Sequence, residues 1–156
     1  MKILFLHGWH STPGGRKPTY LANQGHQVCN PSLCPDDFQR ALQAAQQAYD
    51  EFDPQVIVGS SRGGAVAMNI RSAQTPLVLM CPAWKHWGDV KRLMKPAILI
   101  HSSQDEVVDY EDSVELVKKS GLDARCLWTV GKDHRLADEE ALEALQKACF
   151  ALVSPD

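Results

Sequence analysis

The 156-residue chain lacks several features that would place it in a specialised class. It has 16 lysines and arginines against 19 acidic residues, so no basic excess is available to neutralise nucleic-acid phosphates. No apolar run approaches the roughly 20 residues that span a bilayer. We therefore expect neither a nucleic acid nor a membrane as a partner. The length and the ordinary apolar content predict a single domain over 1–156.

The cysteines also lack a recognisable pattern. The five are Cys29, Cys34, Cys81, Cys126 and Cys149. Their number is odd, their spacing does not repeat, and the apolar stretch at residues 3–6 is too short for an export signal. Reduced thiols in a cytoplasmic protein are therefore expected. No paired Cys-x-x-Cys set completes a tetrahedral zinc site, and we expect no metal and no cofactor.

What the chain does have is an alternation of aliphatic runs and amphipathic segments. The expected strands are residues 2–7, 26–30, 56–60, 77–81, 97–102 and 125–130. Several are apolar on successive residues, which suits strands buried on both faces of a parallel sheet. Expected helices, with apolar residues at three- and four-residue steps, are 36–52, 110–120, 137–153 and a shorter one ending near Gly25. This order predicts a three-layer α/β/α sandwich with a mostly parallel six-stranded sheet.

A serine motif lies at the end of the strand expected at 56–60. The segment Gly59-Ser60-Ser61-Arg62-Gly63 reads Gly-x-Ser-x-Gly and leads into a helix-compatible run. A serine on a sharp strand-to-helix turn needs small residues two positions before and after it, and the turn exposes its hydroxyl. Ser61 is the better nucleophile candidate, since Ser60 would be flanked by Val58 and Arg62. The alternative interpretation is a glycine-rich packing turn whose serines only cap the helix.

Two later loops hold the partners that a serine nucleophile needs, a base and a carboxylate that orients it. Asp105 follows the strand expected at 97–102, and His134 follows the one at 125–130. The chain order Ser61, Asp105, His134 is typical of this nucleophile turn. Other acids of these loops are open as alternatives: Glu106, Asp109 and, less suitably because it adjoins His134, Asp133.

The first expected strand ends in His7-Gly8-Trp9, a turn that brings a second backbone amide beside the nucleophile. We expect the amides of Trp9 and Arg62 to form a two-donor oxyanion hole. His7 is interpreted as a buried histidine bonded to a loop. The Arg62 side chain could bind an anionic substrate group, but an ion pair with a surface acid is the favoured interpretation.

With these segments the sequence resembles the α/β-hydrolase superfamily and is most similar to its compact bacterial serine esterases. The segments that carry the resemblance are Leu6-His7-Gly8-Trp9-His10-Ser11-Thr12-Pro13, Gly59-Ser60-Ser61-Arg62-Gly63-Gly64 and Gly131-Lys132-Asp133-His134-Arg135. The resemblance implies Ser61 as nucleophile, Asp105 as acid, His134 as base, and Trp9 with Arg62 as oxyanion donors.

Little room exists for a lid. Larger members of the superfamily often insert a lid domain between the fourth and fifth strands found here, where this chain has only residues 82–96. An open site without a lid is therefore expected, and it suits short-chain or protruding esters. Trp84 and Trp87 are candidates for an apolar substrate-binding wall, with a place in the core as the alternative. Residues 14–17 lack a complete phosphate-loop pattern and are interpreted as a polar turn entering a short helix.

The expected function is a serine hydrolase that cleaves small-molecule carboxylic esters through an acyl-enzyme on Ser61, as a monomer or weak homodimer. Thioesters or small amides could use the same residues. A protein-binding module with vestigial activity is an alternative of another class, and the complete Ser-Asp-His set argues against it. Dehalogenation requires a carboxylate nucleophile in the place of Ser61 and is therefore set aside.

Overall fold

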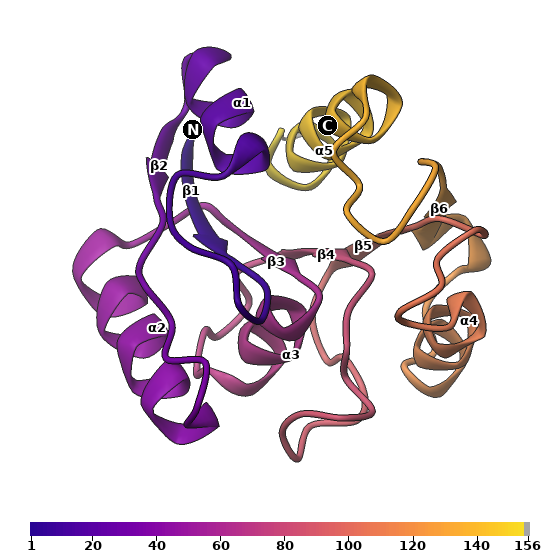
Figure 1. Cartoon of the computed structure of the whole chain (residues 1–156), viewed down its shortest axis with the longest axis horizontal. Coiled ribbons are helices and arrows are strands. Elements are labelled where there is room, and N and C mark those ends of the chain that lie inside the picture. Colours follow the sequence, from indigo (N-terminus) through magenta and orange to yellow (C-terminus); the bar gives the residue numbers. More distant parts are fainter. Residues whose placement is uncertain (155–156) are drawn as a thin grey trace.

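The computed structural model describes residues 1–154, which form one six-stranded sheet with helices on both faces (Figure 1). The strands are β1 (Lys2–Leu6), β2 (Gln27–Cys29), β3 (Val56–Ser60), β4 (Leu77–Met80), β5 (Ala97–His101) and β6 (Leu127–Thr129). The helices are α1 (Arg16–Asn23), α2 (Phe38–Phe52), α3 (Arg62–Asn69), α4 (Tyr110–Lys119) and α5 (Glu139–Val153). Each neighbouring pair of strands is parallel, in the order β2-β1-β3-β4-β5-β6. The expected α/β/α sandwich is confirmed.

The sheet is buried on both sides, which explains why its central strands are apolar at successive positions. Helices α2, α3 and α4 cover one face, and α1 and α5 cover the other (Figure 1). In β1, Leu4 and Leu6 enter the first core cluster, whereas Ile3 and Phe5 enter the second. Neither face of such a strand meets water, so both sets of side chains contribute to burial.

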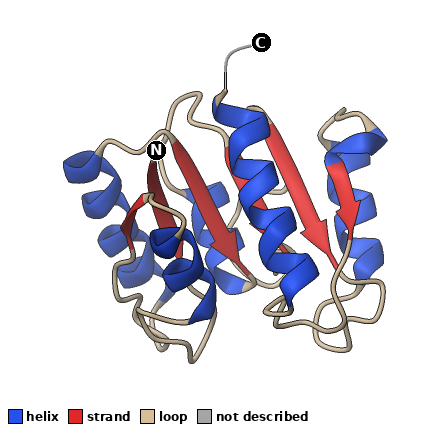
Figure 2. Ribbon diagram, turned by 90° about the horizontal axis from the view of Figure 1, so that it is seen from above, coloured by secondary structure: helices blue, strands red, loops and turns tan. Residues whose placement is uncertain are grey.

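The parallel arrangement brings the loops after the strands to one edge of the sheet. Figure 2 shows the strand arrows pointing toward the same end of the molecule. From the centre the chain builds outward in two directions, from β1 to β2 and from β3 through β4 and β5 to β6. The switch in direction lies between β1 and β3, which is where open α/β sheets form a crevice for ligands.

Several element boundaries differ from the sequence-based expectation by one or more residues, and capping explains two of the differences. Helix α2 begins two residues later than expected, because the Asp37 carboxylate caps it by accepting the amide of Arg40 at 3.1 Å. Asp123 accepts the amide of Arg125 at 2.8 Å and begins a 3-10 turn. That turn occupies the first part of the strand expected at 125–130, so β6 begins at Leu127.

The connection from β4 to β5 contains turns and bends and no helix, so the part of the chain that could hold a lid is a loop. None of the helices within residues 1–154 has the length and apolarity that crossing a membrane requires.

The start of α3 packs directly on the backbone at the end of β1. A Cβ atom added to Gly63 would lie 2.1 Å from the carbonyl oxygen of Leu6 and 2.6 Å from that of His7. A Cβ added to Gly59 would lie 2.5 Å from the carbonyl oxygen of Gly63. Backbone atoms cannot move aside as a flexible side chain would, so these two positions require glycine.

We expect Gly63→Ala to lower the free energy of unfolding by about 3 kcal/mol or more, because the new methyl group meets two backbone carbonyls. Urea unfolding measures the change. Gly15→Ala is the control, since a Cβ at Gly15 meets no atom within 4 Å and the φ angle is −65°. We expect its effect to stay within about 1 kcal/mol. Equal effects of the two variants would contradict the proposed close packing.

Candidate active site

Ser61 occupies a tight turn between β3 and α3. Its backbone has φ 55° and ψ −117°, a conformation that side chains of L-residues rarely adopt. The preceding Ser60 is the last residue of β3 and is buried, and the following Arg62 is the first residue of α3. The turn therefore projects Ser61, and not Ser60, at the carboxyl end of the sheet. Such strain is typical of functional positions, where the surrounding structure holds it in place.

The Ser61 hydroxyl is in hydrogen-bond contact with His134. The distance from Ser61 Oγ to His134 Nε2 is 3.0 Å, and His134 Nδ1 lies 2.8 Å from Asp105 Oδ2. A carboxylate only accepts, so Nδ1 carries the ring proton and Nε2 is free to accept the serine proton. Three residues separated by up to 73 positions in the chain thus form one continuous chain of hydrogen bonds.

Four donors surround the buried carboxylate of Asp105. Its Oδ2 accepts from His134 and from Nε2 of His101 at 3.1 Å, and its Oδ1 accepts from the amides of Val107 and Val108 at 2.8 and 2.9 Å. Burial raises the pKa of Asp105, but the bond from His134 and the two amides together outweigh it and leave the pKa below its usual range. The carboxylate is therefore held in its ionised form.

The other acids of these loops have different contacts. Asp109 caps α4 by accepting the amide of Glu111 at 3.0 Å, and Asp133 accepts the amide of Arg135 at 3.0 Å. Glu106 is exposed. The carboxylate that contacts the His134 ring is therefore that of Asp105.

The loop after β1 passes close to Ser61. A Cβ on Gly8 would lie 3.6 Å from the Cβ of Ser61 and 3.5 Å from the carbonyl oxygen of Ser60. Gly8, Trp9 and Ser61 line a common cleft. As the first residue of α3, Arg62 has an amide without an acceptor inside its own helix. The expected oxyanion donors, the Trp9 and Arg62 amides, thus belong to the two segments that flank the serine.

Searches of protein-family models and of curated protein sequences give no match. Solved structures do match. A protein from Xanthomonas campestris assigned to the alpha/beta hydrolase superfamily is 21% identical, with a TM-score of 0.77 over 97% of this chain and 96% of that one. The mouse alpha/beta hydrolase domain-containing protein 10 is 16% identical, with a TM-score of 0.78 over 97% and 89%. The esterase domain of a Rhodothermus marinus protein is 16% identical, with a TM-score of 0.65 over 96% and 84%. The chain has the α/β-hydrolase fold.

In this α/β-hydrolase fold, His7 is a structural residue. It is buried, its Nε2 accepts the amide of Leu33 at 3.0 Å, and its Nδ1 lies 2.8 Å from the carbonyl oxygen of Gly8. Both ring nitrogens are therefore engaged with the backbone, as expected for a histidine that orders a loop.

The position of the Arg62 side chain shows that both sequence-based interpretations, an anion-binding role and an ion pair with a surface acid, were wrong. It is 1% exposed, so it neither reaches a substrate nor pairs with a surface acid. Its Nη2 donates to the carbonyl of Cys34 at 2.8 Å, and the guanidinium lies 4.7 Å from the ring centroid of Trp87 and 5.4 Å from that of Phe38. Cation–π contacts with two rings replace the expected charge partner.

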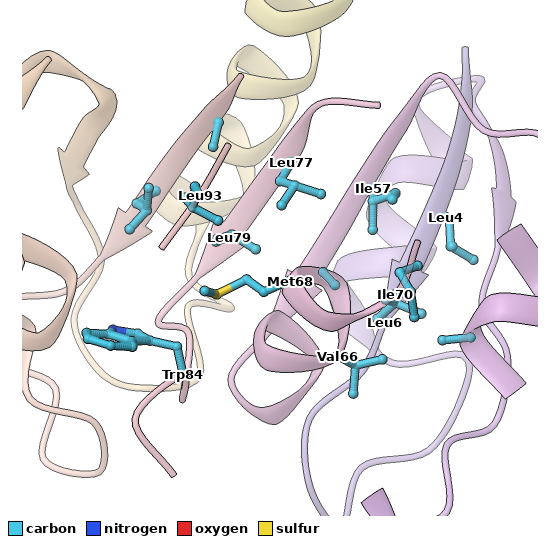
Figure 3. Close-up of a cluster of buried hydrophobic side chains, with 14 of the residues drawn as sticks. Leu4, Leu6, Ile57, Val66, Met68, Ile70, Leu77, Leu79, Trp84 and Leu93 are labelled. Atoms are coloured by element: carbon cyan, nitrogen blue, oxygen red, sulfur yellow. The ribbon is translucent and has the colours of Figure 1, made fainter. Parts of the chain in front are cut away.

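Of the two tryptophans expected to form a substrate wall, Trp84 does not reach the site. It is 2% exposed, lies within the core cluster on the face of α3 and donates its Nε1 to the carbonyl of Asp112 (Figure 3). Trp84 is therefore a core residue that packs against α4. Trp87 is half-buried and meets the exposed Trp9 edge-on, with ring centroids 5.4 Å apart.

Three groups at the site could be considered as metal ligands. A nitrogen of His134, an oxygen of Asp105 and the sulfur of Cys81 lie within 4.8 Å of one another. The Cys81 thiol donates to the carbonyl of His134 at 3.2 Å, and burial raises its pKa to about 12. A thiol must lose its proton to bind a metal, so this cluster is poorly suited to hold one.

Sequence reasoning assigned no role to His101, the second histidine on Asp105. This ring is fully buried, and burial lowers its pKa, so it is neutral. Its Nε2 donates to Asp105 and to the carbonyl of Val108, and its Nδ1 lies 2.7 Å from the hydroxyl of Ser113 in α4. Its position four residues before Asp105, at the end of a buried strand, is the signal that could have found it.

We expect Ser61→Gly to be more stable to unfolding than Ser61→Ala by about 1 kcal/mol, because only glycine tolerates the positive φ angle without strain. Both variants lack the hydroxyl, so the backbone conformation is the feature that separates them. Urea unfolding of the pair measures the difference. Equal stability would contradict a strained turn.

The lowered pKa of Asp105 makes a prediction for stability against pH. A carboxyl whose folded pKa lies below its unfolded value of 3.8 stabilises the fold above that value. The contribution is lost as the pH falls through the folded pKa. We therefore expect the stability advantage of the wild type over Asp105→Asn to shrink as the pH falls from 5 to 2. Unfolding of both proteins across this range measures it, and an advantage that grows on acidification would contradict the ionised carboxylate.

Proposed function

We propose that this protein is a serine hydrolase that cleaves small, accessible carboxylic esters through an acyl-enzyme on Ser61. The observation that carries the proposal is the hydrogen-bond chain from Ser61 Oγ through His134 to Asp105. A serine hydroxyl is a weak nucleophile until an adjacent base takes its proton, and this chain supplies the base and its orienting carboxylate.

In the first half of the reaction, Ser61 Oγ attacks the ester carbonyl while its proton moves to His134 Nε2. Asp105 stabilises the resulting imidazolium through the bond at Nδ1. Negative charge develops on the former carbonyl oxygen, and we expect the amides of Trp9 and Arg62 to donate to it. One such donor contributes about 2.7–4 kcal/mol to transition-state stabilisation. His134 then gives the proton to the leaving alcohol, and the acyl group remains on Ser61.

In the second half, a water molecule replaces the alcohol. His134 takes a proton from this water, the hydroxide oxygen attacks the acyl carbonyl, and the proton returns to Ser61 as the carboxylic acid departs. Water is the one co-substrate that these two steps require.

The lidless loop and an esterase among the structural relatives support an ester substrate of modest size. The cleft beside Ser61 has a volume of about 440 Å³, which is within the range of small-molecule sites. Thioesters and small amides present the same carbonyl chemistry. Esters are favoured over amides because an alcohol is a better leaving group than an amine.

Labelling with a fluorophosphonate, followed by mass spectrometry, tests the proposal. We expect rapid, stoichiometric modification at Ser61 and turnover of p-nitrophenyl acetate in the wild type. Asp105→Asn should lower kcat by roughly 10⁴-fold, because the amide no longer holds the His134 tautomer.

Ser61→Ala and Ser103→Ala form the matched pair for this test. Both remove one serine hydroxyl, but Ser103 is exposed and lies outside the hydrogen-bond chain. Labelling should disappear in the first and persist in the second. A folded wild-type protein that is neither labelled nor active on acetate esters, phenyl thioacetate or p-nitroacetanilide would favour a binding module instead.

A further inference from the structure

Positively charged side chains line the cleft beside Ser61. The cleft reaches from Ser61 and His134 to the start of α1. The lysine and arginine residues that line it are Arg16 and Lys17 of α1 and Arg135 of the loop after β6. All the residues that line the cleft lie within residues 1–154, and none of them is an aspartate or a glutamate. In the whole chain, acidic residues outnumber lysine and arginine by 19 to 16. The cleft therefore reverses the charge balance of the chain locally.

Lys17 is the least exposed of the three cations. Its Nζ donates to the carbonyl oxygen of Arg135 at 2.5 Å. Arg135 directly follows His134 in the chain. Among the ion pairs within residues 1–154, none includes Lys17. Largely buried charges normally have an opposite charge in contact, because removing them from water is costly. The ammonium group retains two further N–H donors for such a partner.

The groups around Lys17 do not provide that partner. Burial lowers the pKa of Lys17, and the neighbouring Arg135 acts in the same direction. The nearby Cys81 thiol stays protonated, because burial raises its pKa to about 12. The negative charge of Asp133 favours the charged form of Lys17. However, the Asp133 carboxylate accepts the amide of Arg135. Asp133 also lines a neighbouring hollow, together with Glu106, and does not line this cleft.

We propose that the ester cleaved at Ser61 carries an anionic group, a carboxylate or a phosphate, which binds beside Lys17 with Arg16 and Arg135 at the rim of the cleft. The inference rests on the proposed function, since it names the substrate class of that site. The Arg135 carbonyl that holds Lys17 adjoins His134, so the anion and the reacting carbonyl occupy the same cleft. A small substrate with both groups can therefore reach both sites at once.

The location of the charge within the substrate decides which product retains it. An anion on the alcohol side leaves in the first half of the reaction, whereas an anion on the acyl side stays with the acyl-enzyme until water attacks. Two pairs of esters separate these cases. 4-Acetoxybenzoate and 4-acetoxybenzamide differ in charge on the alcohol side, and p-nitrophenyl hydrogen adipate and p-nitrophenyl methyl adipate differ on the acyl side.

We expect the anionic member of at least one pair to have a kcat/KM about tenfold or more above its neutral partner, mainly through a lower KM. Lys17→Gln should bring this ratio close to one, because glutamine can still donate to the Arg135 carbonyl but carries no charge. Added salt should reduce the ratio in the wild type, since it screens the attraction.

Lys132→Gln is the matched control, because it removes the same charge from an exposed side chain in the neighbouring hollow. The ratio should persist in this variant. Arg16→Gln, a change at an exposed side chain of the cleft, provides a second measure should Lys17→Gln fail to fold, and it should lower the ratio.

The outcomes separate this inference from the proposed function. Hydrolysis that depends on Ser61 with equal kcat/KM within both pairs overturns the anionic substrate and leaves the hydrolase standing. Equal changes of the ratio in Lys17→Gln and Lys132→Gln also overturn it. If none of the four esters is hydrolysed and Ser61 is not labelled, the hydrolase and its anionic substrate both fall.

Discussion

The backbone contact between the end of β1 and the start of α3 determines the geometry of the candidate site. Gly59 and Gly63 permit it, since a side chain at either position would overlap main-chain atoms. The same contact bends the chain between β3 and α3 and leaves Ser61 in its strained conformation. It also brings the loop after β1 within reach of the serine. A local packing requirement therefore positions the hydroxyl and both expected oxyanion donors together.

The other half of the site depends on electrostatics rather than on close packing. Asp105 is removed from water, and four hydrogen-bond donors compensate for the lost hydration. One of these donors, His101, is in turn held by Ser113 of α4. The orientation of His134 thus depends on a helix that does not itself line the cleft. The first half comes from β1 and β3, which flank the topological switch, and the second comes from β5 and β6. The hydrogen-bond chain therefore exists only in the folded protein.

The sequence was sufficient to predict the fold class. Strand patterning and chain order also explain why the loops that hold Ser61, Asp105 and His134 meet at one edge of the sheet. The sequence could not reveal side-chain direction. Arg62 and Trp84 lie next to site segments in the chain, yet both side chains point into the interior. The Arg62 guanidinium packs against an aromatic ring, and the Trp84 Nε1 donates to a carbonyl of α4. The sequence-based interpretation assigned Lys17 to a polar turn. It could not reveal the hydrogen bond to the Arg135 carbonyl, because that bond joins residues 118 positions apart in the chain. Contacts of that kind have no local signature.

For the proposed hydrolase, the loop between β4 and β5, which contains no helix, has a kinetic consequence. Enzymes that close a cover over their reactants bind, close, react and reopen, and the reopening step often limits the overall rate. A cleft without a lid requires no such closing and reopening. Capture of the reactant would then be governed by diffusion and by the local field of the cations, and departure of the acid by how firmly those same cations hold it. In such an enzyme, a product that binds tightly to the cations would slow each catalytic cycle. A moderate affinity of the cleft for the product would therefore give the highest turnover.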